Sequence, residues 1–381
     1  MIYFDNAATT WPKPEAVYKA ADYFMRELGA NPGRSGHRMA LAAGQIIVDA
    51  RNLVAKLFNV PDPSLVIFTL NTTEALNLGI KGLLKPGDHV ITSSLEHNSV
   101  VRPLETLRNK GIELTKLTTS GSSGLLPEQV EEAIKENTKL IILTHASNVT
   151  GVINPIREIG KIARDRGVLF MVDSAQTAGV FPIDVQAMGI DLLAFAGHKG
   201  LLGPQGVGGL CISKDLQLTP LKEGGTGSNS ESLLQPDKSP DRYESGTSNT
   251  PGLAGLAAGI QFISEIGLEQ IREKERILTE RLLSGLKLIP KVIVYGPPLG
   301  TERSSVISFN IEGVDPSEVS LVLDQSFEIA TRSGLHCAPD AHRTIGTLPK
   351  GTVRLSLGYF NTVEEVDKCL EAVSTISENF I

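Results

Sequence analysis

The sequence has few of the features that mark secreted, membrane-spanning or metal-binding proteins. It contains three cysteines in 381 residues, which is too few for a disulfide framework and suits a reducing cytoplasm. No apolar run approaches about 18 residues, so we expect no membrane span. The N-terminus lacks the charged-then-apolar pattern of a signal peptide. The spacings Cys-x-x-Cys and His-Glu-x-x-His are missing, so we expect no metal site.

Positive charge is not in excess either. The chain carries 36 basic and 43 acidic residues, which gives a net charge of −7. An acidic chain without a basic cluster argues against nucleic acid or an anionic membrane as the main partner. The hydrophobic content of 41% is ample for a large core. The length is sufficient for two domains.

Short apolar runs alternate with amphipathic segments from about residue 40 to residue 215. This alternation predicts an α/β fold with a mainly parallel sheet covered by helices. The expected strands are 65–69, 89–92, 140–144, 169–172, 192–196 and 207–212. The expected helices are 42–58, 73–84, 100–110, 127–136, 156–166 and 185–188.

The chain changes character at residues 222–250, which are rich in Gly, Ser, Pro and Asp. A loop of this length inside a compact fold tends to be functional. A long helical pattern follows at about 252–288, interrupted near Gly267, and leads to a second region. The elements expected there are strands 305–310 and 352–356 and helices 316–325 and 362–377.

Lys199 has unusual surroundings for a lysine. It follows the apolar segment 192–196 and precedes a glycine-rich turn. An amine held among apolar groups has a lowered pKa and becomes nucleophilic. This is the chemistry of a lysine that forms a Schiff base.

Asp173 supplies a second part of a candidate cofactor site. It directly follows the apolar run 168–172, where a carboxylate is costly unless it meets a cation. A protonated pyridine nitrogen is such a cation. One predicted strand separates Asp173 from Lys199, so a single cofactor could contact both. A carboxylate for the pyridine nitrogen and a lysine for the aldehyde form the minimal site for pyridoxal phosphate (PLP).

Other polar residues follow predicted strands, where open α/β sheets bind ligands. Thr72 and Thr73 open a predicted helix, whose N-terminus could bind phosphate or could simply be capped. His97 could stack on a planar cofactor or shuttle protons, or it could have a structural role only. Asn148 could bond a ring substituent, or it could shape a turn.

A series of motifs runs in order along nearly the whole chain. The motifs are Tyr3–Thr10, Thr72–Glu74, Glu96–His97, Ser147–Asn148, Asp173–Gln176, Gly197–Lys199, Glu244–Thr247, Arg332–Cys337 and Arg354–Leu357. This series resembles the cysteine desulfurase and selenocysteine lyase family of the class V aminotransferases, and more closely its group II branch. The resemblance implies a PLP-dependent transferase of fold type I, usually a homodimer. It also implies a large PLP-binding domain at 14–255 and a smaller α+β domain made of 1–13 and 256–381.

The resemblance implies roles for residues around the PLP ring. Lys199 would hold PLP as a Schiff base and move protons. Asp173 would pair with the pyridine nitrogen, and Gln176 would bond the ring oxygen. His97 would stack on the ring and take part in catalysis.

Other cofactor contacts are implied for the phosphate and its surroundings. Thr72 and Thr73 at the helix start, together with His198, would hold the phosphate, and Asn148 would also contact the cofactor. Thr247 would reach the phosphate of the neighbouring subunit, so a homodimer would complete each site.

The resemblance also implies the substrate contacts. Arg354 would bind the substrate carboxylate with two-pronged geometry, and Cys337 would accept the sulfur as a persulfide. Arg332, His37 and Asn6 match positions that line the site. The implied reaction converts L-cysteine to L-alanine and passes sulfur to an acceptor protein, which the sequence does not identify.

The sequence departs from the family pattern at three places and leaves alternatives open. Ala196 stands where many relatives carry Ser or Thr, Asn98-Ser99 follows His97, and the segment after Cys337 differs from the common group II form. A selenocysteine lyase that releases selenide is the first alternative. A class V aminotransferase or PLP β-lyase is the second. A catalytically inactive scaffold that binds a sulfur-carrier protein is the third.

Overall fold

The computed structural model describes residues 1–32, 36–213 and 216–379. Among these residues, seven strands form one sheet in the order β2-β8-β7-β6-β5-β3-β4. The strands are β2 (Val66–Thr69), β3 (His89–Ser93), β4 (Glu113–Leu117), β5 (Thr138–Thr144), β6 (Leu169–Asp173), β7 (Leu192–Ala196) and β8 (Gly208–Ile212). Strand β8 pairs antiparallel with β2 and β7, and the remaining pairs are parallel.

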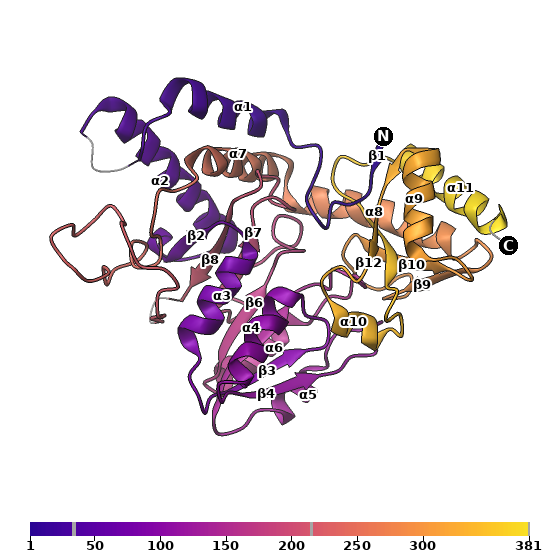
Figure 1. Ribbon diagram of the computed structural model, residues 1–381, viewed down its shortest axis with the longest axis horizontal. Helices are drawn as coiled ribbons and strands as arrows, with labels where there is room; N and C mark the ends of the chain where they lie inside the picture. The colour runs from indigo at the N-terminus through magenta and orange to yellow at the C-terminus, as the bar shows by residue number, and fades with distance from the viewer. Residues whose placement is uncertain (33–35, 214–215, 380–381) are drawn as a thin grey trace.

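Helices cover both faces of this sheet (Figure 1). They are α1 (Glu15–Tyr23), α2 (Arg38–Phe58), α3 (Thr72–Leu83), α4 (Asn98–Arg108), α5 (Pro127–Glu132), α6 (Ile156–Asp165) and α7 (Thr250–Ile266). Alternate residues of one strand face opposite cores, as the period of two requires. In β5, Ile141 and Leu143 belong to the core on the side of α6 and α7. Leu140 and Ile142 belong to the core on the side of α3 and α4.

A second region contains a four-stranded antiparallel sheet in the order β12-β13-β10-β9 and a two-stranded pair of β1 with β11. Its strands are β1 (Ile2–Tyr3), β9 (Val292–Tyr295), β10 (Val306–Ile311), β11 (Ile329–Ala330), β12 (Arg332–Gly334) and β13 (Thr352–Ser356). Its helices are α8 (Leu268–Leu286), α9 (Pro316–Phe327), α10 (Pro339–Thr344) and α11 (Val363–Asn379). Leucines of α8 and valines of α11 share one core with β10 and β13.

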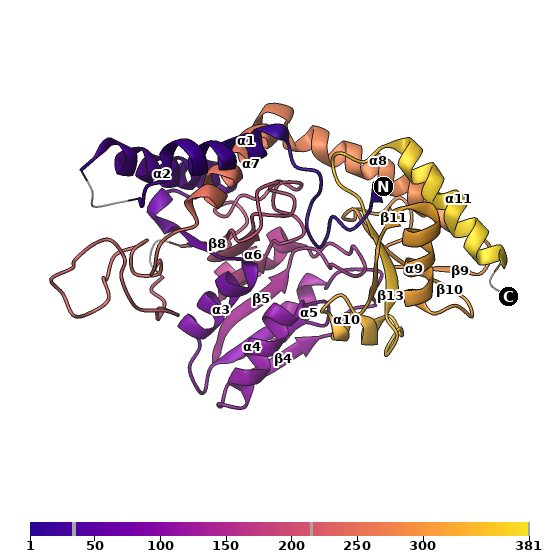
Figure 2. The same ribbon diagram turned by 45° about the horizontal axis from the view of Figure 1, so that its top comes forward.

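The N-terminal segment connects the two regions. Strand β1 pairs in parallel with β11 of the second region. Residues beyond it run to the first region, where the Thr10 N–H donates to the His198 carbonyl oxygen at 3.1 Å. Figures 1 and 2 show this segment passing between the two sheets. We call residues 5–13 the N-terminal strap.

The structure confirms the predicted α/β alternation and contains elements that the sequence did not predict. These are strands β1, β4, β9, β11 and β12 and helices α1 and α10. Strands β4 and β9 each lie at an edge of their sheet. Residues 185–188 form a turn and not a helix, in which the Asp184 side chain accepts from the Ala187 N–H at 2.8 Å. The predicted break near Gly267 is the junction of α7 and α8.

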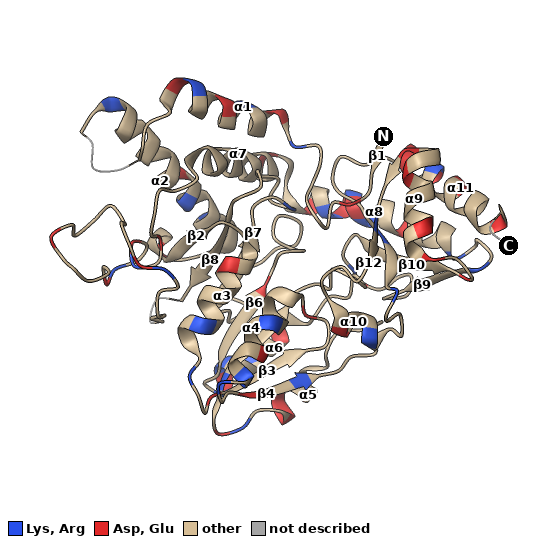
Figure 3. Cartoon of the chain, in the orientation of Figure 1, with Lys and Arg blue, Asp and Glu red and all other residues tan. Residues whose placement is uncertain are grey.

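The described helices carry mixed charges and are not suited to span a membrane singly. No single helix in the described ranges is long and apolar enough to cross a membrane, although α7 and α8 would pass that test as a pair bent by 83°. Figure 3 shows residues of both signs interspersed along outer helices such as α1 and α8.

Candidate active site

Three predicted site residues lie at the carboxyl ends of the parallel strands β7, β6 and β3, with β5 between the last two. Asp173 ends β6, and Lys199 follows β7 after a short turn. His97 follows β3 and caps the N-terminus of α4. Lys199 acts electrostatically on both Asp173 and His97. The fold therefore brings these three side chains to one edge of the sheet, where α/β folds bind ligands.

Lys199 has the character of a nucleophilic amine. Burial lowers the pKa of Lys199 from 10.5 to about 8, against the opposing effect of the Asp173 carboxylate. The guanidinium groups of Arg354 and Arg332 lower this pKa further. A considerable fraction of the amine is therefore neutral near pH 7.

Asp173 is a buried carboxylate at the end of β6. Its Oδ1 accepts a hydrogen bond from the Ala175 N–H at 2.9 Å. Burial raises the pKa of Asp173, while this hydrogen bond and the charge of Lys199 lower it. Asp173 forms no ion pair with a lysine or arginine within the ranges that the structure describes. A pyridinium nitrogen would supply the missing charge, so the site fits PLP.

His97 is held as a neutral imidazole. Burial, followed by the charges of Lys199 and Arg332, lowers the pKa of His97 to about 4. Its Nδ1 accepts from the Ser99 N–H at 3.1 Å and lies 2.9 Å from the Ser99 hydroxyl. That hydroxyl lies 2.7 Å from the hydroxyl of Thr73. Ser99 thus fixes the ring of His97 relative to the predicted phosphate site, a role that the sequence did not reveal.

The start of α3 has the features of an anion site. The Asn71 side chain caps the helix by accepting from the Glu74 N–H at 2.9 Å. The N–H groups of Thr72 and Thr73 have no partner within the helix, because they belong to its first turn. Thr72 is buried and Thr73 is exposed. The N-terminal dipole of this 12-residue helix favours a phosphate.

His198 adds a further polar group beside Lys199. Burial lowers the pKa of His198 to about 4, with smaller effects from Lys199 and Lys13. Its Nδ1 is buried without a hydrogen-bond partner among the described residues. Such an unpaired ring nitrogen suits a phosphate or a bridging water. Ala196, which replaces a frequent hydroxyl residue, is buried at the end of β7.

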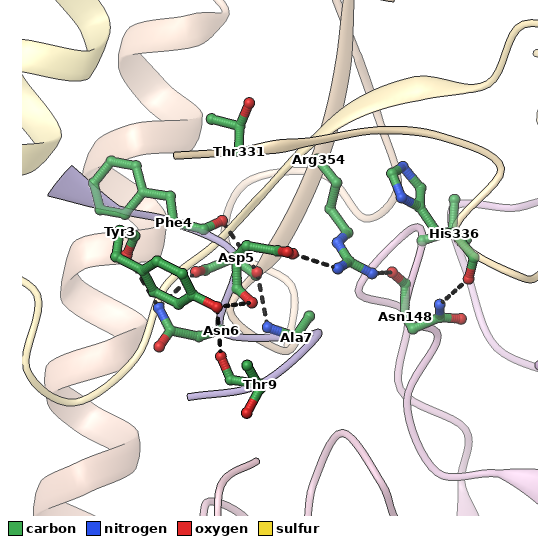
Figure 4. A network of polar contacts seen from close by, with 12 residues as sticks. Tyr3, Phe4, Asp5, Asn6, Ala7, Thr9, Asn148, Thr331, His336 and Arg354 are labelled. Atoms are coloured by element: carbon green, nitrogen blue, oxygen red, sulfur yellow. Dashed lines mark hydrogen bonds and ion pairs between the residues drawn. The ribbon is translucent and has the colours of Figure 1, made fainter. Parts of the chain in front are cut away.

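Arg354 occupies a central position between the strap and Asn148. Its guanidinium is 1% exposed, and its Nη2 pairs with Asp5 Oδ1 at 2.7 Å. Its Nη1 donates to the Asn148 carbonyl oxygen at 3.1 Å. Figure 4 shows the guanidinium between these two partners. Arg332 lies directly opposite Arg354 in the β12–β13 pair.

Cys337 is an exposed free thiol on a constrained turn. His336 and Cys337 have φ angles of 47° and 58°, a conformation that costs non-glycine residues energy. Two hydrogen bonds hold this turn. The Asn148 side chain donates to the His336 carbonyl at 2.7 Å. The Asn98 N–H donates to the Cys337 carbonyl at 2.7 Å.

The ring of His336 does not serve the thiol directly. It is buried, with its Nε2 at 3.2 Å from the Thr352 carbonyl oxygen. Burial lowers the pKa of His336 to about 2. By contrast, Cys337 lies within electrostatic reach of Arg354. Asn148 contacts both the His336 carbonyl and the Arg354 guanidinium, so the turn and the arginine share a neighbour.

The remaining predicted residues lie on the strap, at the start of α2, after β6 and on the long loop. Gln176 donates to the Ala7 carbonyl oxygen at 3.2 Å. Asn6 is buried and donates to the Ser356 carbonyl at 3.0 Å, so it anchors the strap. His37 is exposed and caps α2, where its Nδ1 accepts from the Ala40 N–H at 3.2 Å. Thr247 is exposed on the long loop.

The long loop that carries Thr247 is tied to the first region by Arg51. The Arg51 guanidinium pairs with Glu244 through two bonds of 2.7 and 2.9 Å. The Phe68 N–H also donates to Glu244. Thr247 follows this anchor and lines a hollow of about 820 Å³ together with residues 224–230.

The strap contributes two residues that the sequence did not single out. Asp5 pairs with Arg354, as described above. Lys13 donates to the His198 carbonyl oxygen at 2.8 Å, and burial lowers the pKa of Lys13 to about 8. Asp5 belongs to the motif Tyr3–Thr10, but its partner lies 349 residues away, and no local pattern reveals such a contact.

Comparison with known proteins gives consistent results. The class-V aminotransferase family profile matches residues 2–369. A probable cysteine desulfurase of Methanothermobacter thermautotrophicus is 37% identical over 382 residues, which cover 99% of this chain and 94% of the relative. A cysteine desulfurase of Yersinia pseudotuberculosis is 34% identical and is matched over 99% of this chain and 94% of its own.

Solved structures are similar over the same length. The apo structure of a cysteine desulfurase from Thermococcus onnurineus NA1 has a TM-score of 0.94 and 37% identity. The match covers 99% of this chain and 94% of that chain. A cysteine desulfurase from Escherichia coli, in an S-sulfonic acid form, has a TM-score of 0.90 and 30% identity, covering 100% and 95%.

Proposed function

The chain belongs to the class-V aminotransferase family, and from this we propose that it is a PLP-dependent cysteine desulfurase. In this reaction L-cysteine gives L-alanine, and the sulfur is held as a persulfide on Cys337 for transfer to an acceptor protein. One observation carries the proposal: an exposed thiol lies on a constrained turn that is hydrogen-bonded to Asn148, the residue that also contacts the buried Arg354. An aminotransferase has no need of this thiol.

The residues around Lys199 would perform the proton transfers. PLP, when bound, draws electrons from the substrate Cα. The neutral amine of Lys199 is suited to remove the Cα proton, because its pKa of about 8 lies close to neutral pH. The Asp173 carboxylate would keep a proton on the pyridine nitrogen. His97, with its pKa of about 4, would remain an uncharged ring against the cofactor.

The residues on the opposite side would handle the carboxylate and the sulfur. Arg354 would bind the substrate carboxylate. The Cys337 thiolate would attack the substrate sulfur, so that an S–S bond forms and the Cβ–S bond breaks. The electron pair of the broken bond would stay on Cβ, which is protonated to give alanine. Because Asn148 and Asn98 fix the two carbonyls of the turn, the thiol is held in place for this attack.

Alanine release from L-cysteine and from L-selenocysteine, with and without a reductant, tests the proposal. We expect the wild type to release alanine from L-cysteine, and Cys337→Ala to lose this activity while retaining activity on L-selenocysteine. Cys369→Ala is the matched control, because Cys369 is a buried thiol of the small-domain core.

Three outcomes would favour other functions. A strong wild-type preference for L-selenocysteine would replace the proposal with a selenocysteine lyase. Formation of a keto acid in place of alanine would identify an aminotransferase or a β-lyase. If adding L-cysteine leaves the absorbance of bound PLP unchanged, the chain would be a binding scaffold without turnover.

We further propose a cytoplasmic homodimer in which Thr247 completes the phosphate site of the neighbouring subunit. The long loop projects from the body (Figures 1 and 2). Leu233 and Leu234 on this loop are 103% and 80% exposed, so their apolar side chains are available to a neighbouring subunit. The three free cysteines suit the cytoplasm.

The domain division at 14–255, with 1–13 and 256–381 forming the smaller unit, remains part of this proposal. Light scattering tests whether the protein is a dimer. Thr247→Ala should weaken PLP binding without dissociating the dimer. Dissociation constants for PLP, measured from its absorbance, distinguish this variant from the wild type. A monomer with full PLP affinity would refute the role of Thr247.

A further inference from the structure

The N-terminal strap contacts several residues of the candidate site at once. Asp5 pairs with Arg354, and the Ala7 carbonyl accepts from Gln176. Thr9, Thr10 and Lys13 all donate to the carbonyl oxygen of His198, the residue before Lys199. A single stretch of nine residues thus reaches the predicted substrate arginine, the predicted ring-oxygen contact and the peptide of the lysine. Asp5 is the charged residue of this stretch that faces the substrate arginine.

Arg354 retains binding capacity after it pairs with Asp5. A guanidinium has five N–H donors, and the two described bonds use one on Nη1 and one on Nη2. The Nε of Arg354 is buried without a hydrogen-bond partner among the described residues. An unpaired buried donor is costly, so an arriving carboxylate would satisfy it. Asp5 therefore leaves the Nε–H of Arg354 available to a ligand carboxylate.

Asp5 also sets the charge around the ligand. Arg354 and Arg332 are opposite each other across β12 and β13. Both lower the pKa of Lys199, whereas Asp5 raises it. The pair of arginines with Asp5 carries a net charge of one positive unit, which matches one carboxylate. Without Asp5 the net charge would be two, which would match a dicarboxylate.

The position of Asp5 is rigid. Its backbone bridges to Ser356 of β13. The Ser356 N–H donates to the Phe4 carbonyl at 2.8 Å, and the Ala7 N–H donates to the Ser356 hydroxyl at 2.9 Å. Figure 4 shows Asp5 between Phe4 and Ala7, with its carboxylate directed toward Arg354. Because both neighbours of Asp5 are tied to β13, the carboxylate stays beside Arg354 when a ligand arrives.

We propose that Asp5 is a specificity-determining residue that restricts the Arg354 site to ligands with a single carboxylate. The proposal rests on the proposed role of Arg354 as the carboxylate-binding residue. Asp5 repels a second negative charge on the ligand, and it holds the guanidinium in the orientation that accepts the first.

The test compares propionate and succinate as probes of the PLP-loaded enzyme. Their dissociation constants are measured by isothermal titration calorimetry, which requires no turnover. Asp5→Asn keeps an oxygen acceptor for Arg354 but removes the charge. The compared quantity is the ratio of the two dissociation constants, succinate to propionate. We expect Asp5→Asn to lower this ratio by about tenfold or more, because one unit charge is removed within a few ångströms in a partly buried site. Asp5→Glu should retain the wild-type ratio.

Two further variants support the interpretation. Asp367→Asn removes another aspartate that pairs with an arginine of the small domain, at an exposed site, and should leave the ratio unchanged. Arg332→Gln removes a positive charge and should shift the ratio in the opposite direction, toward propionate. This second measurement keeps the proposal testable if Asp5→Asn does not fold.

A succinate-to-propionate ratio that stays within twofold of wild type in Asp5→Asn would overturn the proposal. If Asp5→Asn cannot be purified, an unchanged ratio in Arg332→Gln would overturn it. Failure of the proposed function looks different, because L-cysteine would then give no alanine while the carboxylate ratio still responds to Asp5. The single tryptophan, Trp11, lies in the strap against the ring of Tyr3, so its fluorescence independently reports whether ligands move the strap.

Discussion

The lowered pKa of Lys199 predicts an early onset of its reaction with PLP as pH rises. With a pKa of about 8 in place of 10.5, the neutral amine at pH 7 is about 300 times more abundant. The rate of PLP attachment should therefore increase about tenfold per pH unit up to about pH 8 and then level off. Stopped-flow absorbance after mixing apoenzyme with excess PLP measures this rate.

Neighbouring charges should move the midpoint of this profile in defined directions. Asp173 stabilises the ammonium form of Lys199, so Asp173→Asn should shift the midpoint to lower pH. Arg332 destabilises the ammonium form, so Arg332→Gln should shift it to higher pH. Because these charged groups act on one another in a partly buried site, each shift should be readily measurable.

Lys13 provides the control for this experiment. Burial lowers the pKa of Lys13 to about 8 as well, and its Nζ bonds the His198 carbonyl. Lys13→Gln should therefore retain the profile, whereas Lys199→Ala should abolish PLP attachment. A midpoint near 10 in the wild type, or loss of the profile in Lys13→Gln alone, would refute the assignment.

Other predictions concern stability and the long loop. Glu96 is fully buried, accepts from the Thr144 N–H at 2.8 Å, and burial raises the pKa of Glu96 to about 8. The folded protein keeps the Glu96 carboxyl protonated up to about pH 8, whereas the unfolded chain loses this proton near pH 4.5. The free energy of unfolding of the wild type should therefore fall as pH rises from 4.5 to 8. In urea unfolding, Glu96→Gln should become more stable than the wild type as pH rises over that range. Glu96→Ala should cost about 1–3 kcal/mol of unfolding free energy at pH 5, because it leaves the Thr144 N–H unpaired. Equal pH dependence of stability in Glu96→Gln and the wild type would contradict this. Arg51→Met leaves Glu244 unpaired in a mostly buried site and should cost about 3–5 kcal/mol in thermal unfolding and expose the loop to protease. Arg276→Met, at an exposed pair, should cost no more than about 1 kcal/mol, and similar losses in both variants would count against a structural role for Arg51.

The parts of the fold that the sequence predicted are the parts whose side chains are buried on both faces. Strands β6 and β7 consist almost entirely of buried residues, and each reads as a short apolar run. Strands β4 and β9 are edge strands whose residues are mostly half-buried. Lysine and glutamate within Glu113–Leu117 interrupt the apolar pattern, because an edge strand needs less burial.

Some residues of the candidate site could be predicted from the sequence, and others could not. Lys199 and Asp173 stand out in the sequence because each places a charge next to an apolar run. Asp5 and Lys13 do not, because each acts on a partner far along the chain, and only the folded chain brings the partners together. Ser99 follows His97 closely, but its contact with Thr73 depends on how α3 and α4 pack.

The pairing of β1 with β11 has a consequence for synthesis on the ribosome. The strands of the large sheet lie within residues 66–212, so this sheet can assemble while the C-terminal third is still being made. Residues 2–3 must wait for residues 329–330 to emerge, and Asp5 must wait for Arg354. Residues 2–5 are thus made before the large sheet but find their partners after it, and a chain that stops short of residue 354 would have a lysine pocket but no closed carboxylate site.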